Sequence, residues 1–401
     1  DEDTGKKVTL NSASFKIKDA QGNYVVQKVS GTKVDTFTTN SDNEIIPVVE
    51  KGTVTLPLML NAGTYTIEEI KTPKGFLDLE KPVEFVISST YDYDVDEDAD
   101  PIVEVKIRNR QPKGEIKLNK TVMDLDTDTD LVDRSDLSKI QFVLKAKEDI
   151  YSSIDGSLMF EKDSVITTEN SGAIVNTGNE VRNGIYALSL DGHLDISNLP
   201  MSTKGASYYL QEVKTLDGCV LDTAQYDAVF KQSDFTTKNY IKSFDVENKT
   251  TDFEFNKTDV TGDKEVEGAQ LTITDEDGNV VDQWTSDGKV HSIEGLVVGK
   301  TYTLSETVTA KDYVKATDIK FTVKNSSELE KVTMKDKQVF VSKTTVGGEE
   351  VTGAHMQIID EDGNIIDEWY SEGKSHIANG LEEGKTYTCL LYTSPSPRDR
   401  G

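Results

Sequence analysis

Short segments of the chain alternate apolar and polar residues, and turn-forming residues separate these segments. Residues 252–257 read DFEFNK and residues 301–306 read TYTLSE, so every second side chain lies on the same side of an extended backbone. The turns between such segments include residues 277–279 and 362–364, both DGN, and this sequence favours hairpins. Thr, Val, Asp and Gly are plentiful, and long apolar segments with helical spacing do not occur. The pattern predicts an all-β fold of short antiparallel strands.

The same pattern recurs along the chain. Residues 268–303 and 353–388 align without gaps, and each contains a DEDGN hairpin followed by GKTYT. Looser copies share a strand of the form Tyr-x-apolar-x-Glu, which reads YTIEE at 65–69, YYLQE at 208–212 and YTLSE at 302–306. Internal repeats of this kind predict tandem domains, and short strands at this spacing predict β-sandwiches.

The repeats divide the chain into four predicted domains. A length of 401 residues also favours three or four domains. We call them the first to fourth repeats: residues 1–111, which lack the first strand; residues 112–249, a larger domain with an insert at 152–183; residues 250–337; and residues 338–388, a truncated copy. Because the linkers are very short, we expect the domains to stand in a fairly stiff row.

The last residues break the repeat abruptly. Residues 389–401 read CLLYTSPSPRDRG, which resembles the translation of a sequencing-library adapter, so we expect an artefact here, although a natural Pro-rich tail is the alternative. If so, Cys219 is the one natural cysteine, and it cannot form an internal disulfide. The sequence shows no signal peptide, transmembrane segment or sorting motif and begins without Met. We therefore expect a truncated sequence.

The charge of the chain restricts its partners. The sequence has 44 Lys and Arg against 72 Asp and Glu, a formal net charge of −28. Nucleic acids and anionic membranes both attract Lys and Arg, so the charge argues against either partner. It favours a self-repelling, extended protein.

Polar side chains recur at three places on the predicted apolar faces. A Lys ends the first strand of a repeat, a Glu lies in the central strand, and an Asn or Asp ends the last strand. The residues are Lys120, Glu212 and Asn248 in the second repeat, Lys257, Glu306 and Asp336 in the third, Glu69 and Asn109 in the first, and Lys343 in the fourth. Burying a charge costs several kcal/mol unless it is paired or neutralised. A single such Lys could extend to water from a strand end, but the recurrence favours a shared role.

This combination of residues can form a covalent bond. Burial lowers the pKa of a Lys, which makes the amine nucleophilic, and raises the pKa of a Glu, which keeps it protonated. A protonated Glu can hydrogen-bond to the Asn or Asp carbonyl, polarise it and transfer protons. Attack by the amine then releases ammonia or water and leaves an amide. The residues predict single-turnover self-cross-linking and no enzymatic activity on a separate substrate.

With these residues, the chain resembles the Cna B-type, or SpaA-like, prealbumin-like repeat domains of Gram-positive cell-wall-anchored surface proteins and pilins. The matching elements are Lys-Thr-Asp at 257–259, Gly-Ala at 268–269, the DEDGN hairpin, GKTYTLSE at 299–306 and YTIEEIKTPKGF at 65–76. The resemblance implies tandem antiparallel sandwiches of Ig-like type. The chain departs from the family pattern at Leu216 and Cys219, and at residues 310–312, which concern a surface turn.

The resemblance also implies roles for the recurring residues. Lys120 would bond to Asn248 with Glu212 as the promoting residue, and Lys257 would bond to Asp336 with Glu306. The first repeat keeps Glu69 and Asn109, but its Lys would precede residue 1. The fourth repeat keeps Lys343 without a Glu or an acceptor, so neither end repeat would complete its bond.

The sequence offers one further candidate site and two further functions. Residues 124–130, DLDTDTD, alternate acids as calcium loops do but lack the Gly and later Glu of an EF-hand loop, so a solvated acidic loop is the default. We expect no cofactor, metal or small-molecule substrate. The leading function is a stalk segment of an extracellular, cell-wall-anchored adhesin or pilin-like protein. The alternatives are an adhesin module that binds host matrix protein or glycan through the insert at 152–183, and a spacer of an exported enzyme.

Overall fold

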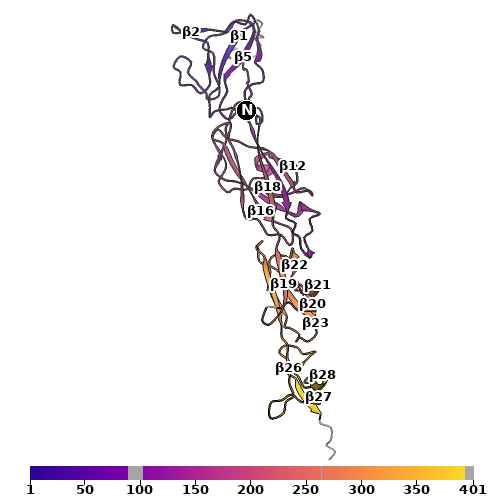
Figure 1. Ribbon diagram of the computed structural model, residues 1–401. Helices are drawn as coiled ribbons and strands as arrows, with labels where there is room; N and C mark the ends of the chain where they lie inside the picture. The colour runs from indigo at the N-terminus through magenta and orange to yellow at the C-terminus, as the bar shows by residue number, and fades with distance from the viewer. Residues whose placement is uncertain (89–102, 263, 393–401) are drawn as a thin grey trace, which may run out of the picture. The chain divides into compact units, whose positions relative to one another are not determined.

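The computed structural model describes residues 1–88, 103–262 and 264–392, and it confirms the all-β class (Figure 1). Within these residues the helical segments are α1 (Thr168–Ser171) and the 3-10 turn η1 (Leu137–Lys139). No helix in the described ranges is long and apolar enough to cross a membrane. The chain forms two compact units. The N-terminal unit is Asp1–Thr121, Ser135–Thr215 and Asp222–Val246, and the C-terminal unit is Val122–Arg134, Leu216–Leu221 and Glu247–Gly401. The division into four domains stays a prediction.

In the N-terminal unit, the first repeat forms one sheet of order β4-β1-β5-β6 and one small hairpin, β2-β3. The strands are β1 (Ser14–Asp19), β2 (Gln27–Val29), β3 (Thr32–Val34), β4 (Phe37–Thr38), β5 (Gly63–Lys71) and β6 (Val83–Ile87). Antiparallel pairing sets Phe15 opposite Glu69 and Ile17 opposite Ile67. Alternate side chains of β1 and β5 therefore form a common core.

The second repeat contributes two larger sheets, of orders β12-β15-β7-β18 and β13-β14-β9-β16-β17, and a hairpin, β10-β11. The strands are β7 (Lys113–Val122), β9 (Gln141–Ala146), β10 (Ile150–Tyr151), β11 (Leu158–Phe160), β12 (Ile174–Thr177), β13 (Asn179–Arg182), β14 (Ile185–Ala187), β15 (His193–Leu199), β16 (Ala206–Lys214), β17 (Gln225–Phe230) and β18 (Asn239–Asn248). The alternation in β7 and β16 buries Ile116, Leu118, Tyr208 and Leu210. Strands β11 to β13 lie within the predicted insert at 152–183.

In the C-terminal unit, the third repeat contributes sheets of orders β25-β19-β22-β8 and β21-β20-β23-β24. Figure 1 shows β19 beside β22, and β20 between β21 and β23. The strands are β8 (Thr129–Asp130), β19 (Asp252–Asp259), β20 (Glu267–Thr274), β21 (Val280–Asp287), β22 (His291–Glu294), β23 (Thr301–Val308), β24 (Ile319–Thr322) and β25 (Glu330–Asp336). The end strands β19 and β25 pair in parallel, with Lys257 opposite Met334 and Asp259 opposite Asp336. This parallel pair was not expected from the sequence.

The fourth repeat contributes a pair, β26-β29, and a sheet, β28-β27-β30. The strands are β26 (Phe340–Val341), β27 (Thr352–Ile359), β28 (Ile365–Glu372), β29 (His376–Ile377) and β30 (Thr388–Tyr392). Leu391 faces Met356, in the position where Glu306 faces Leu271 in the third repeat. The first four residues of the expected artefact thus lie in β30, and residues 393–401 lie outside the described residues.

Residues 122–134 join the C-terminal unit as an added edge. Within this segment, β8 pairs in parallel with β22, with Thr129 opposite Ile293. Nearby, Gly218 adopts a φ of +83°, and a Cβ there would lie 2.4 Å from the carbonyl oxygen of Gly295. Only Gly fits such a close backbone approach.

Candidate self-cross-linking site

Lys257 lies on the core-facing side of β19 because the strand alternates. Phe253 and Phe255 are buried on the same face, and Lys257 follows them two residues further on with 2% exposure. The strand therefore carries the amine into the apolar core and away from water. A cation at this depth requires a partner.

The structure brings Glu306 and Asp336 to this amine. Lys257 Nζ donates a hydrogen bond to Asp336 Oδ1 at 2.5 Å and lies 3.1 Å from Glu306 Oε1. Both acids have an exposed fraction of 0%. The two acids lie on different sheets, because Glu306 is on β23 and Asp336 is the last residue of β25. The amine is thus in contact with two carboxyl groups in one buried site.

The electrostatics make Asp336 easier to protonate than an exposed Asp. Burial raises the pKa of Asp336, Lys257 opposes the rise and the nearby Glu306 adds to it, and together they bring the pKa to about 6. Asp336 Oδ2 is buried and accepts no hydrogen bond from the residues that the structure describes. A buried unsatisfied acceptor costs about 1–3 kcal/mol. Conversion of the pair to an amide, with loss of that oxygen as water, would remove this cost.

A backbone group that the sequence could not indicate holds the other oxygen of Glu306. The N–H of Ala316 donates to Glu306 Oε2 at 2.8 Å. Oε2 is therefore engaged, and Oε1 is the oxygen that faces Lys257.

In the second repeat, the predicted residues are all buried at strand ends or centres. Lys120 on β7, Glu212 on β16 and Asn248 at the end of β18 have exposed fractions of 0%, 3% and 1%. The N–H of Asp222 donates to Glu212 Oε2 at 2.9 Å, as Ala316 does for Glu306. Lys120 Nζ lies 5.7 Å from the centroid of the Phe142 ring. Their pairing into a bond stays a prediction.

In the first repeat, Glu69 and Asn109 are brought together. Asn109 Nδ2 donates to Glu69 Oε2 at 2.8 Å, and the Thr72 hydroxyl donates to the same oxygen at 3.0 Å. Burial raises the pKa of Glu69, although these hydrogen bonds oppose the rise.

In the fourth repeat, Lys343 is only half-buried, and its Nζ lies 3.4 Å from the carbonyl oxygen of Thr344.

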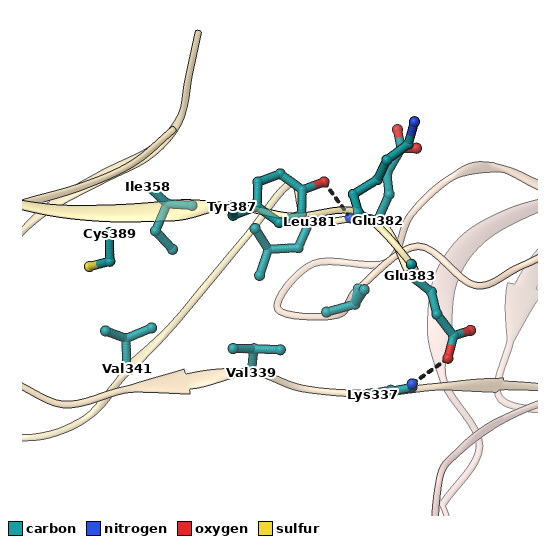
Figure 2. Close-up of a pocket in the computed structure, with 12 residues that line it drawn as sticks. Lys337, Val339, Val341, Ile358, Leu381, Glu382, Glu383, Tyr387 and Cys389 are labelled. Carbon is teal, nitrogen blue, oxygen red and sulfur yellow. Dashed lines mark hydrogen bonds and ion pairs between the residues drawn. The ribbon is translucent and has the colours of Figure 1, made fainter. Parts of the chain in front are cut away.

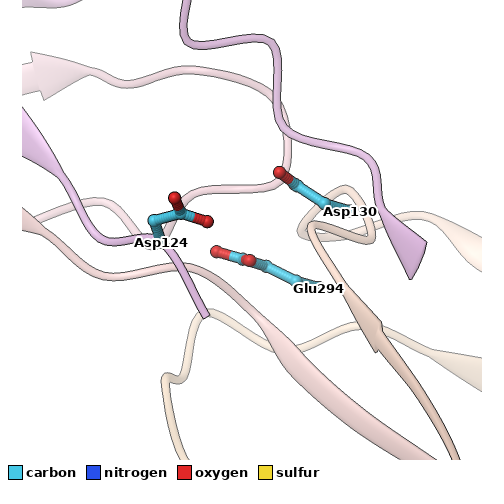
Figure 3. A group of neighbouring side chains, drawn as sticks. All are labelled: Asp124, Asp130 and Glu294. Atoms are coloured by element: carbon cyan, nitrogen blue, oxygen red, sulfur yellow. The ribbon is translucent and has the colours of Figure 1, made fainter. Parts of the chain in front are cut away.

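Three carboxyl groups gather where residues 122–134 meet β22, and Figure 3 shows them facing a common space. Asp124, Asp130 and Glu294 each offer an oxygen within 4.8 Å of the others. Arg134, however, donates to Asp130 Oδ2 and to Glu294 Oε1, both at 2.6 Å. This arrangement is an ion-pair network, which sequence reasoning missed because Arg134 and Glu294 are 160 positions apart. Calcium at residues 124–130 stays an alternative without support from these contacts.

An apolar pocket of about 410 Å³ opens in the C-terminal unit (Figure 2). Figure 2 shows Val339 and Val341 on one wall and Ile358 and Tyr387 on the other. In the third repeat, Val323 and Met334 fill the corresponding core. The described part of the fourth repeat has no strands equivalent to β24 and β25. The pocket is therefore the part of the hydrophobic core of this repeat that those strands would cover.

Comparisons with known proteins identify the domain type. The sequence profile of the family described as "SpaA: Prealbumin-like fold domain" matches residues 1–100 and 251–338. No protein with a curated description matches the chain significantly.

Several solved structures resemble the chain at low identity. The Bacillus anthracis TIE protein is 16% identical over 96% of this chain, which spans 62% of that protein, with a TM-score of 0.30. BcpA, the major pilin subunit of Bacillus cereus, is 13% identical over 82% of this chain and 95% of its own, with a TM-score of 0.34. The shaft pilin spaA from Lactobacillus rhamnosus GG is 16% identical over 58% of this chain and 100% of its own, with a TM-score of 0.25. At these TM-scores the likenesses carry no argument about function.

The profile match covers the third repeat, which holds the Lys257 site, and most of the first repeat, which holds Glu69. The expected resemblance is therefore confirmed: residues 1–100 and 251–338 of this chain match the family of SpaA-like, Cna B-type prealbumin-like domains.

Proposed function

We propose that the chain is a stalk segment of a bacterial surface protein or pilin-like fibre, and that its domains lock themselves with intramolecular isopeptide bonds. The observation that carries the proposal is the buried contact of Lys257 with Asp336 and Glu306. An extracellular, cell-wall-anchored location follows from this role as part of the proposal. The chain would then act on itself once and on no separate substrate.

The proposed reaction is a condensation in the third repeat. A proton passes from the Lys257 ammonium to the Asp336 carboxylate, which gives a neutral amine and a neutral acid. Lys257 Nζ attacks Asp336 Cγ, a C–N bond forms, and a C–O bond breaks. Glu306 accepts the proton that the nitrogen loses and delivers it to the departing hydroxyl, which leaves as water. Glu306 ends unchanged, and the product is a neutral amide in place of a buried ion pair.

The position of the bond suits a domain that is held under tension. Strands β19 and β25 are the first and last strands of the third repeat and are direct neighbours in one sheet. A bond between Lys257 and Asp336, which are 79 positions apart, would carry tension from one end strand to the other and bypass the chain between them. The hydrogen bonds and the core of the domain would then remain outside the path of the force.

The test is the intact mass of residues 1–388 under denaturing conditions. The bonds at Asp336 and Asn248 lower the mass by one water and one ammonia. Lys257→Ala should abolish the first loss alone, and Lys120→Ala should abolish the second alone. Proteolysis should release a branched peptide that joins β19 to β25. An unshifted mass in the unmodified chain would show that these residues are only buried polar groups.

A ligand-binding adhesin module remains the second candidate. The insert at 152–183 exposes Leu158, Met159 and Ile174, and such side chains suit a contact with host matrix protein or glycan. Binding of the full chain to arrayed matrix proteins and glycans, compared with a triple Ser variant at these positions, tests this role. Equal binding by the two chains would exclude the insert as the binding surface.

A further inference from the structure

A backbone amide ten positions after each promoting Glu reaches back to its carboxyl group. Ala316 donates to Glu306 and Asp222 donates to Glu212 through their backbone N–H groups, at 2.8 and 2.9 Å. The backbone of Leu79 also hydrogen-bonds to Glu69. The side chains at these positions differ, so the shared element is the main-chain N–H and its spacing from the Glu.

The path of the chain after β23 explains how the N–H of Ala316 reaches Glu306. After β23 ends at Val308, the backbone turns through Asp312, which has a φ of +71°, and comes back as an extended segment. The N–H of Val314 then donates to the carbonyl oxygen of Lys337 at 2.9 Å. The segment is thus anchored next to Asp336, and two residues later Ala316 meets Glu306. One short segment therefore contacts the strand of the acceptor and the promoting acid.

We propose that the N–H of Ala316 is a positioning group for the Lys257–Asp336 reaction, because it holds Glu306 Oε2 and leaves Oε1 to carry the proton. This inference rests on the proposed function. Oε1 lies 3.1 Å from Lys257 Nζ, and Nζ lies 2.5 Å from Asp336 Oδ1. Oε1 accepts the proton from the nitrogen and gives it to the departing oxygen of Asp336, so a single oxygen serves both steps.

A main-chain donor suits this task because it cannot change rotamer. A hydrogen bond to a charged group contributes about 1.5–3 kcal/mol, and its loss lets the carboxyl group rotate about its last torsion. If most of that stabilisation supports the reactive orientation, bond formation slows by about 10- to 100-fold without the donor.

The experiment follows bond formation in the full chain. Chain recovered unfolded, with its starting mass verified, is refolded, and samples are quenched over time for mass spectrometry of the β19–β25 branched peptide. Ala316→Pro removes the N–H, and Lys315 before it lies in an extended bridge that tolerates a following Pro. Ala316→Gly is the matched control, because it keeps the N–H and removes the buried methyl group.

The expected result is a wild-type rate for Ala316→Gly and a 10- to 100-fold lower rate for Ala316→Pro. Replacement of Ala316 by lactic acid keeps the methyl group and changes the amide to an ester, so it tests the N–H even if the Pro variant does not fold. Wild-type rates in the folded Pro variant or in the ester variant would overturn the positioning role. Absence of the bond in the unmodified chain would instead overturn the proposed function.

Discussion

Glutamine at position 306 would separate the covalent bond from the packing around it. Glu306→Gln keeps the size of the side chain but cannot accept the proton of the amine, so the Lys257–Asp336 bond should not form. The open chain between these residues spans 79 positions. Closing a loop of this length reduces the entropy of the unfolded chain and stabilises the fold by about 4.5 kcal/mol. For a domain of this size, that loss lowers the melting temperature by roughly 20–35 °C.

Tryptophan fluorescence can report on the third repeat within the full chain. The sequence has 2 Trp, and Trp284 stacks on His291 with 4.1 Å between the ring centroids. A Trp369→Phe background leaves Trp284 as the single reporter. Denaturant and thermal unfolding would be compared between this background and the same background with Glu306→Gln, after mass spectrometry has shown which chains carry the bond.

A second variant removes the bond together with the amine. Lys257→Met lacks both the bond and the ammonium, and it leaves the buried carboxyl groups of Asp336 and Glu306 without a cation, so it should lose at least as much stability as the bond alone contributes. Both variants should lose the contribution that loop closure makes to the free energy of unfolding. If Lys257→Met without the bond unfolds within about 1 kcal/mol of the cross-linked chain, the loop-closure argument is wrong. If Glu306→Gln still forms the bond, the role assigned to Glu306 is wrong.

Three further predictions concern the same unit. D336N should react with loss of ammonia and reach the same final mass as the cross-linked wild-type chain, because both give the same amide; two different product masses on intact-mass analysis would contradict this. The pKa of Asp336 is raised to about 6, so the rate of bond formation should fall as the pH drops below 6, where Asp336 and Lys257 both hold protons. Just above pH 6 the rate should be constant, because the ion pair and the neutral pair hold equal numbers of protons. Quenched refolding at each pH measures this rate, and a rate that rises in acid would refute the prediction. Arg134→Ala leaves the buried carboxylate of Glu294 without its guanidinium, so we expect the free energy of unfolding to fall by about 3–5 kcal/mol. Adding Glu294→Leu should recover most of this loss. An unchanged unfolding midpoint in Arg134→Ala would show that the ion pair is dispensable.

The alternation of side chains predicted the fold class and the burial of the candidate residues. In DFEFNK the period of two places Phe253, Phe255 and Lys257 on one face, and β19 buries that face. Local sequence is sufficient here, because the pleat of a strand fixes the direction of each side chain. The conspicuous feature was a charge on an apolar face, and this feature is visible without knowledge of the partner strands.

Contacts between distant segments could not be predicted in the same way. Nothing in residues 122–134 indicates that β8 adds to β22, or that Arg134 pairs with Glu294. Glu294 looks like an ordinary polar residue at a strand end until its neighbour is known. The amide of Ala316 is invisible for another reason: every residue except Pro has one, and only the path of the chain shows which amide reaches Glu306.

The register of the end strands makes the proposed bond a consequence of correct folding. In the parallel ladder Lys257 lies opposite Met334, so Asp336 lies two residues further along the same face. The long Lys side chain spans this diagonal. A slip of β25 by one residue would turn Asp336 from the core to the other face of the sheet, where water would keep it ionised and away from Glu306. The amine, the acceptor and the oriented carboxyl group therefore meet only in the native register, and the bond then makes that register irreversible.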